Sequence, residues 1–126
     1  MAAQTQNGNY HLFNRRGEKQ AGSPLDFKAE VNTPAKITSD GAGSLKITAI
    51  SVGGELIRGN FSGEITYRNQ LVKENRDDRF ELLTDEKGAS FWIVNRQFNQ
   101  TKIFDEKEQL IFTIPQSGDL ILEYFD

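Results

Sequence analysis

The sequence predicts an all-β fold, an antiparallel β-sandwich of about eight to ten short strands connected as a jelly roll or an immunoglobulin-like meander. Three observations support this fold class: apolar and polar residues alternate with a period of two, turn-forming residues separate these segments, and helical periodicity is weak throughout. Alternate side chains of a strand point to opposite faces, so each segment buries one face. A closed β-barrel of the lipocalin-like type is the alternative. It needs long, coiled strands, and only residues 56–68 offer one.

The first clear strand covers residues 25–31. Leu25, Phe27, Ala29 and Val31 alternate there with polar residues. Pro34 ends the strand, because proline has no N–H to donate to a neighbour.

A β-hairpin is predicted over residues 45–67. The three-residue loop Val52-Gly53-Gly54, with one glycine in the left-handed region, closes such a hairpin with a bulge. A two-residue turn would shift the register by one and mix apolar with charged side chains on both faces. The three-residue loop instead gives the apolar pairs Leu45 with Phe61, Ile47 with Gly59, and Ala49 with Ile57.

The second arm of this hairpin is expected to be one long strand. Gly59 and Gly63 then mark a bend, at points where a side chain would crowd the facing sheet. The other face of the hairpin carries Lys46 and Thr48 and is expected to lie in water, with Ile50 and Leu56 as exceptions near the turn.

The C-terminal half repeats the alternation. Residues 89–96 are apolar on both faces, which is typical of a central strand or of a face that meets a partner subunit. The predicted strands place Phe80 and Leu82 opposite Phe91 and Ile93, lead from residues 98–104 into Leu110, Phe112 and Ile114, and turn at 115–119 into a strand over 120–124.

Length and composition indicate one β domain over residues 1–126, with residues 1–8 as a flexible tail. The chain has no cysteine and one histidine, which excludes disulfides, zinc fingers and thiol nucleophiles.

The net charge is −3, and positively and negatively charged residues are interspersed along the chain. This distribution argues against nucleic acid as a partner. No segment of about eighteen apolar residues is present, so no membrane insertion is expected. The opening residues lack an apolar leader. A cytoplasmic protein is therefore favoured over an exported domain whose leader has been removed.

Two kinds of candidate site follow from the residues. Trp92 and its polar neighbours suit a ligand or partner patch, since aromatic rings stack on sugar faces and amides bond to hydroxyls; the patch comprises Trp92, Asn95, Arg96, Gln97 and Asn99. Acidic turns suit Ca²⁺, which takes oxygen ligands, although none matches an EF-hand; the candidates are Asp77, Asp78, Asp85 and Asp105. No other metal site and no cofactor are expected.

Residues 53–63 resemble a hairpin found in many small bacterial β-domains. The length and strand number are similar to those of fatty-acid-binding proteins and lipocalins. The sequence offers no helical lid after its first strand and no Gly-x-Trp start. No functional residue is carried over from either family.

We therefore expect a non-catalytic binding or interaction module, acting in self-association, in assembly with a partner protein, or in carbohydrate recognition. The alternative is a carrier of small apolar ligands, built on a barrel whose interior is lined by Phe13, Phe27, Phe61, Phe91 and Phe112. An enzyme that uses acidic residues is a second alternative. It is disfavoured because a glycosidase cleft needs more scaffold than 126 residues easily provide.

Overall fold

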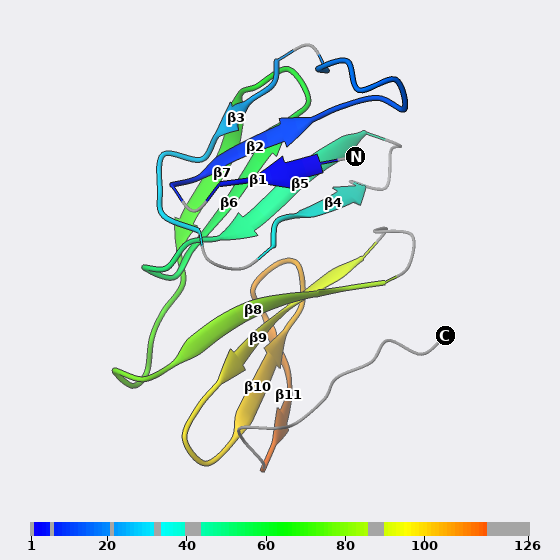
Figure 1. The fold of residues 1–126 in the computed structure, drawn as a ribbon. Coiled ribbons are helices and arrows are strands. Elements are labelled where there is room, and N and C mark those ends of the chain that lie inside the picture. The colour runs from blue at the N-terminus through cyan, green and yellow to red at the C-terminus, as the bar shows by residue number, and fades with distance from the viewer. Residues whose placement is uncertain are drawn as a thin grey trace.

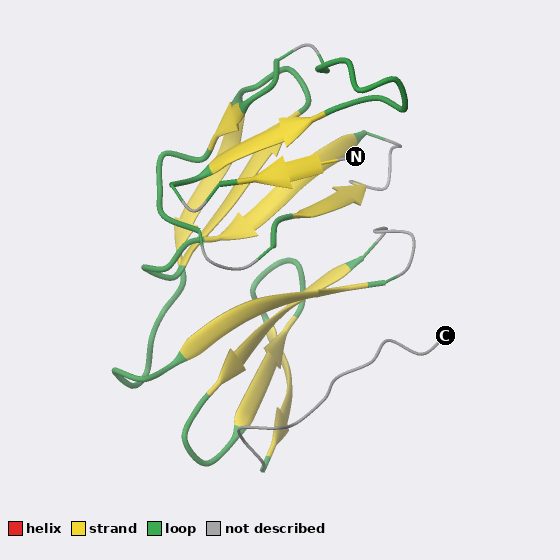
Figure 2. Cartoon of the chain, in the orientation of Figure 1, coloured by secondary structure: helices red, strands yellow, loops and turns green. Residues whose placement is uncertain are grey.

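The computed structural model describes residues 2–5, 7–20, 22–31, 34–39, 44–85 and 90–115, and these contain strands and loops but no helix (Figure 2). The all-β antiparallel prediction is confirmed, and the described strands form no closed barrel. The strands are β1 (Ala2–Gln4), β2 (Asn9–Leu12), β3 (Leu25–Asp26), β4 (Lys36–Ser39), β5 (Leu45–Ile50), β6 (Glu55–Asn60), β7 (Ile65–Gln70), β8 (Arg79–Thr84), β9 (Phe91–Arg96), β10 (Thr101–Phe104) and β11 (Leu110–Ile114).

These strands form three antiparallel sheets. The first has the order β1-β2-β3, the middle sheet β4-β5-β6-β7, and the third β11-β10-β9-β8. In Figure 1 the third sheet lies below the other two, and residues 71–78, here called the connector, join it to β7 along the left side. Residues 2–4, which the sequence placed in a flexible tail, form β1 and pair with β2.

The predicted register of the 45–67 hairpin is confirmed. Ile47 pairs with Gly59 and Ala49 pairs with Ile57. The loop is closed by a hydrogen bond of 2.9 Å from the Ser51 N–H to the Glu55 carbonyl, and Gly54 has a φ of +85°. Three loop residues and a left-handed glycine therefore set this register.

The prediction of one long second arm is wrong, because the chain turns between β6 and β7. Asn60 Oδ1 accepts hydrogen bonds of 3.0 Å from the N–H groups of Ser62 and Glu64. Gly63 has a φ of +87°, in the left-handed region that this turn requires. An asparagine side chain that bonds to the backbone two residues on imitates a turn. The pair Asn60 and Gly63 therefore makes two strands where the apolar alternation alone predicts one.

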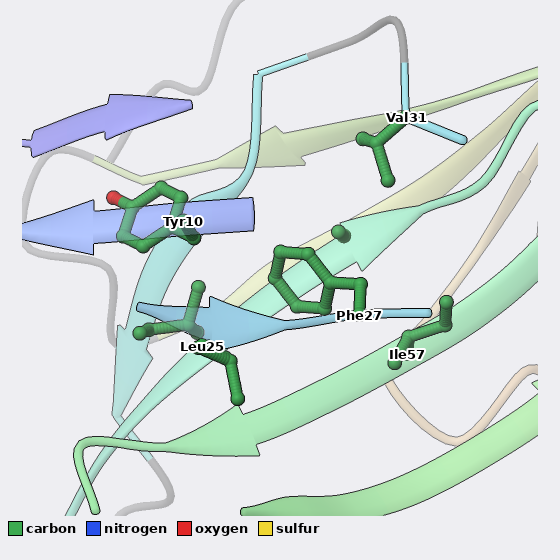
Figure 3. Close-up of a cluster of buried hydrophobic side chains, with 7 residues drawn as sticks. Tyr10, Leu25, Phe27, Val31 and Ile57 are labelled. Atoms are coloured by element: carbon green, nitrogen blue, oxygen red, sulfur yellow. The ribbon is translucent and has the colours of Figure 1, made fainter. Parts of the chain in front are cut away.

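The first buried cluster lies between the first and middle sheets (Figure 3). The predicted strand over 25–31 is only partly correct, because β3 ends at Asp26 and Lys28 takes a φ of +53°. The predicted inward positions Leu25, Phe27 and Val31 are nonetheless at most 2% exposed. The cluster comprises Tyr10, Leu25, Phe27, Val31, Ile47, Ala49 and Ile57.

Gly59 lies where the first and middle sheets approach closely, as predicted. A Cβ atom at this position would lie 2.5 Å from Leu25 Cδ2 and 3.1 Å from the Glu64 carbonyl oxygen. The backbone of β6 can therefore approach Leu25 only without a side chain at residue 59.

The second buried cluster joins the middle sheet to the third. The side chains of Ile50 and Leu56 project from the second face of the middle sheet and pack with Leu71, Phe91 and Ile93. The expectation that this second face lies in water is therefore wrong for Thr48, whereas Ser62, Glu64 and Thr66, which were expected on the same face, are exposed. Thr48 on this face is completely buried, and its Oγ1 lies 3.1 Å from Oγ1 of Thr38, also buried. The third sheet covers this face of the middle sheet, and the apolar pattern of one hairpin cannot indicate that another sheet packs against it.

In the third sheet, β9 lies between β8 and β10, which confirms that residues 89–96 contain a central strand. Leu82 pairs with Ile93, but Phe80 pairs with Asn95 and Phe91 with Thr84, so the predicted pairing of this hairpin is only partly correct. Residues 101–104 lead through a turn into β11 as predicted. The predicted strand over 120–124, and most of the turn before it, lie outside the described residues.

Candidate ligand pocket

A pocket of about 290 Å³ opens where the connector passes between the middle and third sheets, and we call it the inter-sheet pocket. Its volume is near the lower end of the range for small-molecule sites. It is lined by Asn69, Gln70, Leu71, Val72, Glu74, Phe80, Ile93, Phe104 and Glu108. A second depression of about 470 Å³ is lined by Asn7, Lys28, Ala29 and Glu30, and it is much more open to solvent.

Apolar side chains form one part of the pocket lining. Leu71 and Ile93 are buried members of the second cluster, and Phe80 and Phe104 pack against that cluster while remaining partly exposed. They come from the connector, β9, β8 and β10 respectively. Because the cluster fixes each of them, the apolar wall is part of the protein core.

Glu108 reaches the pocket from the turn between β10 and β11. Asp105 builds this turn: its Oδ1 accepts hydrogen bonds of 2.9 Å from the N–H groups of Lys107 and Gln109. Glu108 has a φ of +64°, which is uncommon for a residue with a side chain. The same left-handed position is taken by Gly54 and Gly63 in the two hairpin loops of the middle sheet, so the turn itself requires this φ.

The Glu108 carboxylate bonds to two side chains of β7. It accepts hydrogen bonds from the Tyr67 hydroxyl at 2.7 Å and from Asn69 Nδ2 at 2.5 Å. The hydrogen bond to this carboxylate raises the pKa of Tyr67, and partial burial raises it further. Arg58 lies behind Tyr67, with its guanidinium carbon 5.1 Å from the Tyr67 ring centre and 4.8 Å from that of Phe91. These contacts hold the turn against the middle sheet.

Two further polar side chains complete the rim. Glu74 forms an ion pair of 2.5 Å with Lys102 Nζ of β10. Gln70 Nε2 donates to the carbonyl oxygens of Gly53, at 2.9 Å, and Leu71, at 3.2 Å. The rim is therefore tied to both sheets and to the β5–β6 loop before any ligand arrives.

Asp78 fixes the connector and so the pocket wall that the connector forms. Asp78 Oδ2 accepts four hydrogen bonds: from the N–H groups of Glu74, at 2.9 Å, and Asn75, at 3.2 Å, from Asn95 Nδ2 at 3.1 Å and from Gln97 Nε2 at 3.3 Å. Burial alone would raise the pKa of Asp78, but these hydrogen bonds outweigh burial and lower it. The connector is thus anchored to β9 by one ionised carboxylate.

The structure does not bring the predicted Trp92 patch together on one surface. Asn95 and Gln97 are buried and donate to Asp78. Trp92 and Arg96 lie on the opposite face of β9, where Trp92 is half-buried and Arg96 Nε bonds to Glu81 at 2.8 Å. Asn99 is exposed in the turn between β9 and β10.

The candidate Ca²⁺ ligands also lie apart in the fold. Asp77 is exposed beside the buried Asp78, Asp85 follows β8, and Asp105 bonds to its own turn. Among the described residues, no three histidine, aspartate or glutamate side chains are placed to hold a metal ion.

The five phenylalanines proposed to line a barrel are distributed over different environments. Phe27 lies in the first cluster, Phe91 in the second, and Phe112 is 57% exposed on β11. Across the described ranges no helix is long and apolar enough to cross a membrane. Comparison with family models, with curated proteins and with solved structures gives no match for this chain.

Sequence reasoning missed Asn69 and Glu74 as site residues, and it considered Tyr67 only as an aromatic ring for stacking and Glu108 only as a Ca²⁺ ligand. The one available signal was the Asp105-Glu106-Lys107-Glu108 turn, whose charges also fit an ordinary solvated hairpin. The other three side chains become neighbours of the pocket only through the packing of the third sheet on the middle one.

Proposed function

We propose that this chain is a non-catalytic binding module that holds a small organic ligand in the inter-sheet pocket. The observation that carries the proposal is the composition of the lining, in which an apolar wall from the core faces a rim of carboxylate and amide groups. Small-molecule sites combine such a wall with a few polar groups that fix the orientation of the ligand.

The state of the two carboxylates supports binding over catalysis. Glu108 accepts two hydrogen bonds from β7, and Glu74 is paired with Lys102. These partners hold both carboxylates in fixed positions. Such groups are suited to holding a ligand in a fixed orientation.

Nuclear magnetic resonance can test the proposal with a library of small fragments. We expect fragments to shift the backbone amide resonances of residues 69–72 and 104–108 and to leave those of the first sheet unchanged. Fragment binding that shifts only resonances elsewhere would contradict the proposal.

A pair of matched variants makes this test specific. Val72 lines the pocket and is 81% exposed, so Val72→Arg should block the pocket while the protein stays folded. Val52→Arg introduces the same charge at a 47% exposed position in the β5–β6 loop. Fragment binding should disappear in Val72→Arg and persist in Val52→Arg. Equal binding to both variants would refute the pocket as the site.

A further inference from the structure

The rim of the inter-sheet pocket offers mainly hydrogen-bond acceptors to a ligand, because the protein itself uses most of the side-chain donors; Asn69 commits one of its two N–H groups to Glu108. Asn69 Nδ2 donates to the Glu108 carboxylate, and Gln70 Nε2 donates to two backbone carbonyl oxygens. Carboxylate and carbonyl oxygens only accept hydrogen bonds, so these partners fix the orientation of both amides. The oxygen atoms of Asn69 and Gln70 are therefore left to face other groups.

Lys102 is paired with this rim, and its ammonium group is already used by Glu74. Lys73 lies between Val72 and Glu74 in the chain, but it is exposed and is not part of the pocket lining. The Lys102 side chain is 18% exposed, and the pair leaves the second carboxylate oxygen of Glu74 as a further acceptor. Glu74 and Glu108 are the charged residues among those lining the pocket. Arg58 lies outside the lining, between the rings of Tyr67 and Phe91.

From this inventory we infer that the ligand is an organic cation, with a primary ammonium group on an apolar body. The ammonium group has three donors and no acceptor, which complements a rim of acceptors with two carboxylates. The apolar body would occupy the wall formed by Phe80, Phe104, Leu71 and Ile93, where a cation also gains from nearby aromatic rings. The inference rests on the proposed function and names the ligand class for that same pocket.

The volume sets the size of this ligand. About 290 Å³ corresponds to roughly ten times the volume that one water molecule occupies in the liquid. A ligand of roughly ten non-hydrogen atoms, such as a single ring with a short aminoalkyl chain, therefore fits. The same lining disfavours a fatty acid, because an anionic head group would meet two carboxylates.

Three ligands of one shape test the sign of the charge: 2-phenylethylamine, 2-phenylethanol and phenylacetate. We expect the amine to bind about tenfold more tightly than the alcohol, as one charge-assisted hydrogen bond predicts, and phenylacetate to give no saturable binding. Nα-acetyl-lysine methylamide, measured beside the amine, distinguishes a lysine side chain from a free amine as the natural source of the ammonium group. Binding is measured by titration of the amide resonances of the full chain.

Two variants are expected to change the affinity in opposite directions, which structural damage to the pocket would not do. Glu74→Gln should weaken binding of 2-phenylethylamine about tenfold, and Lys102→Met should strengthen it, because the Glu74 carboxylate is then unpaired. Glu106→Gln, an exposed position in the same turn as Glu108, is the matched control and should leave the affinity unchanged.

Failure of the inference and failure of the proposed function give different results. If the alcohol or phenylacetate binds as tightly as the amine, or if Lys102→Met also weakens the amine, the cation inference is wrong and the pocket remains a binding site. Absence of binding by all three ligands also overturns the inference. The fragment screen with Val72→Arg then decides whether the pocket binds anything.

Discussion

Replacing Asp78 should release the connector that joins the middle sheet to the third sheet. Asp78→Ala removes the acceptor of four hydrogen bonds and leaves the buried amides of Asn95 and Gln97 without it. A hydrogen bond to a charged group contributes about 1.5–3 kcal/mol, and four bonds that share one oxygen add less than their sum. We therefore expect a loss of roughly 3–4 kcal/mol in the free energy of unfolding.

For a chain of 126 residues this loss corresponds to a fall in Tm of roughly 11–15 °C. Asp78→Asn retains one acceptor oxygen and loses only the charge, so it should cost about 1–2 kcal/mol. Urea unfolding followed by circular dichroism measures both values. Asp77→Ala is the matched control, since Asp77 is exposed and should change stability by less than about 0.5 kcal/mol. If Asp78→Ala and Asp77→Ala unfold at the same urea concentration, the connector is not anchored by this carboxylate.

The same carboxylate predicts how stability depends on pH. The pKa of Asp78 is lower in the folded protein than the ordinary aspartate value of about 3.9. A group with a lowered folded-state pKa contributes its full stability above the unfolded-state value and loses it as the pH falls through the folded-state value. The wild-type protein should therefore lose stability in this acidic range more steeply than Asp78→Asn. Parallel stability curves for the two proteins would show that another group controls the acid transition.

Two further outcomes are expected. Gly59→Ala should lower the free energy of unfolding in urea by about 1–3 kcal/mol, because its Cβ would lie 2.5 Å from Leu25 Cδ2. Gly53→Ala is the control and should be nearly neutral, because the nearest atom to its Cβ is 3.8 Å away; equal stability of the two variants would contradict the close approach of the sheets. Glu108→Gln should lower the pKa of Tyr67 towards its ordinary value, since the negative acceptor that disfavours the phenolate is gone, and a pH titration of the Tyr67 ring resonances that shows no change would contradict the Tyr67–Glu108 hydrogen bond.

Local rules were sufficient for much of the fold. The pairing of Ile47 with Gly59 followed from loop length and face consistency, which act within one hairpin. The same rules did not predict the turn after Asn60, where one side chain bonding to its own backbone overrides the apolar alternation. They also placed Thr48 in water, because its cover comes from a sheet that begins about thirty residues later in the chain.

The site was harder to predict for the same reason. The pocket combines the end of β7, the connector, three strands of the third sheet and one turn, and no local pattern links these segments. The Trp92 patch assumed that neighbours in sequence share a surface. Strand alternation separates Trp92 from Asn95, and the burial of Asn95 was not predictable without knowing the position of Asp78.

The two faces of β5 and β6 have a consequence for how the molecule comes apart. Ala49 and Ile57 contribute to one buried cluster, while Ile50 and Leu56, their immediate neighbours in the chain, contribute to the other. Severing the connector and removing the third sheet would expose Ile50 and Leu56 to solvent, and Phe91 and Ile93 of the detached sheet would lose these packing partners. The two halves should therefore melt in a single transition, and neither half alone is a promising unit for expression.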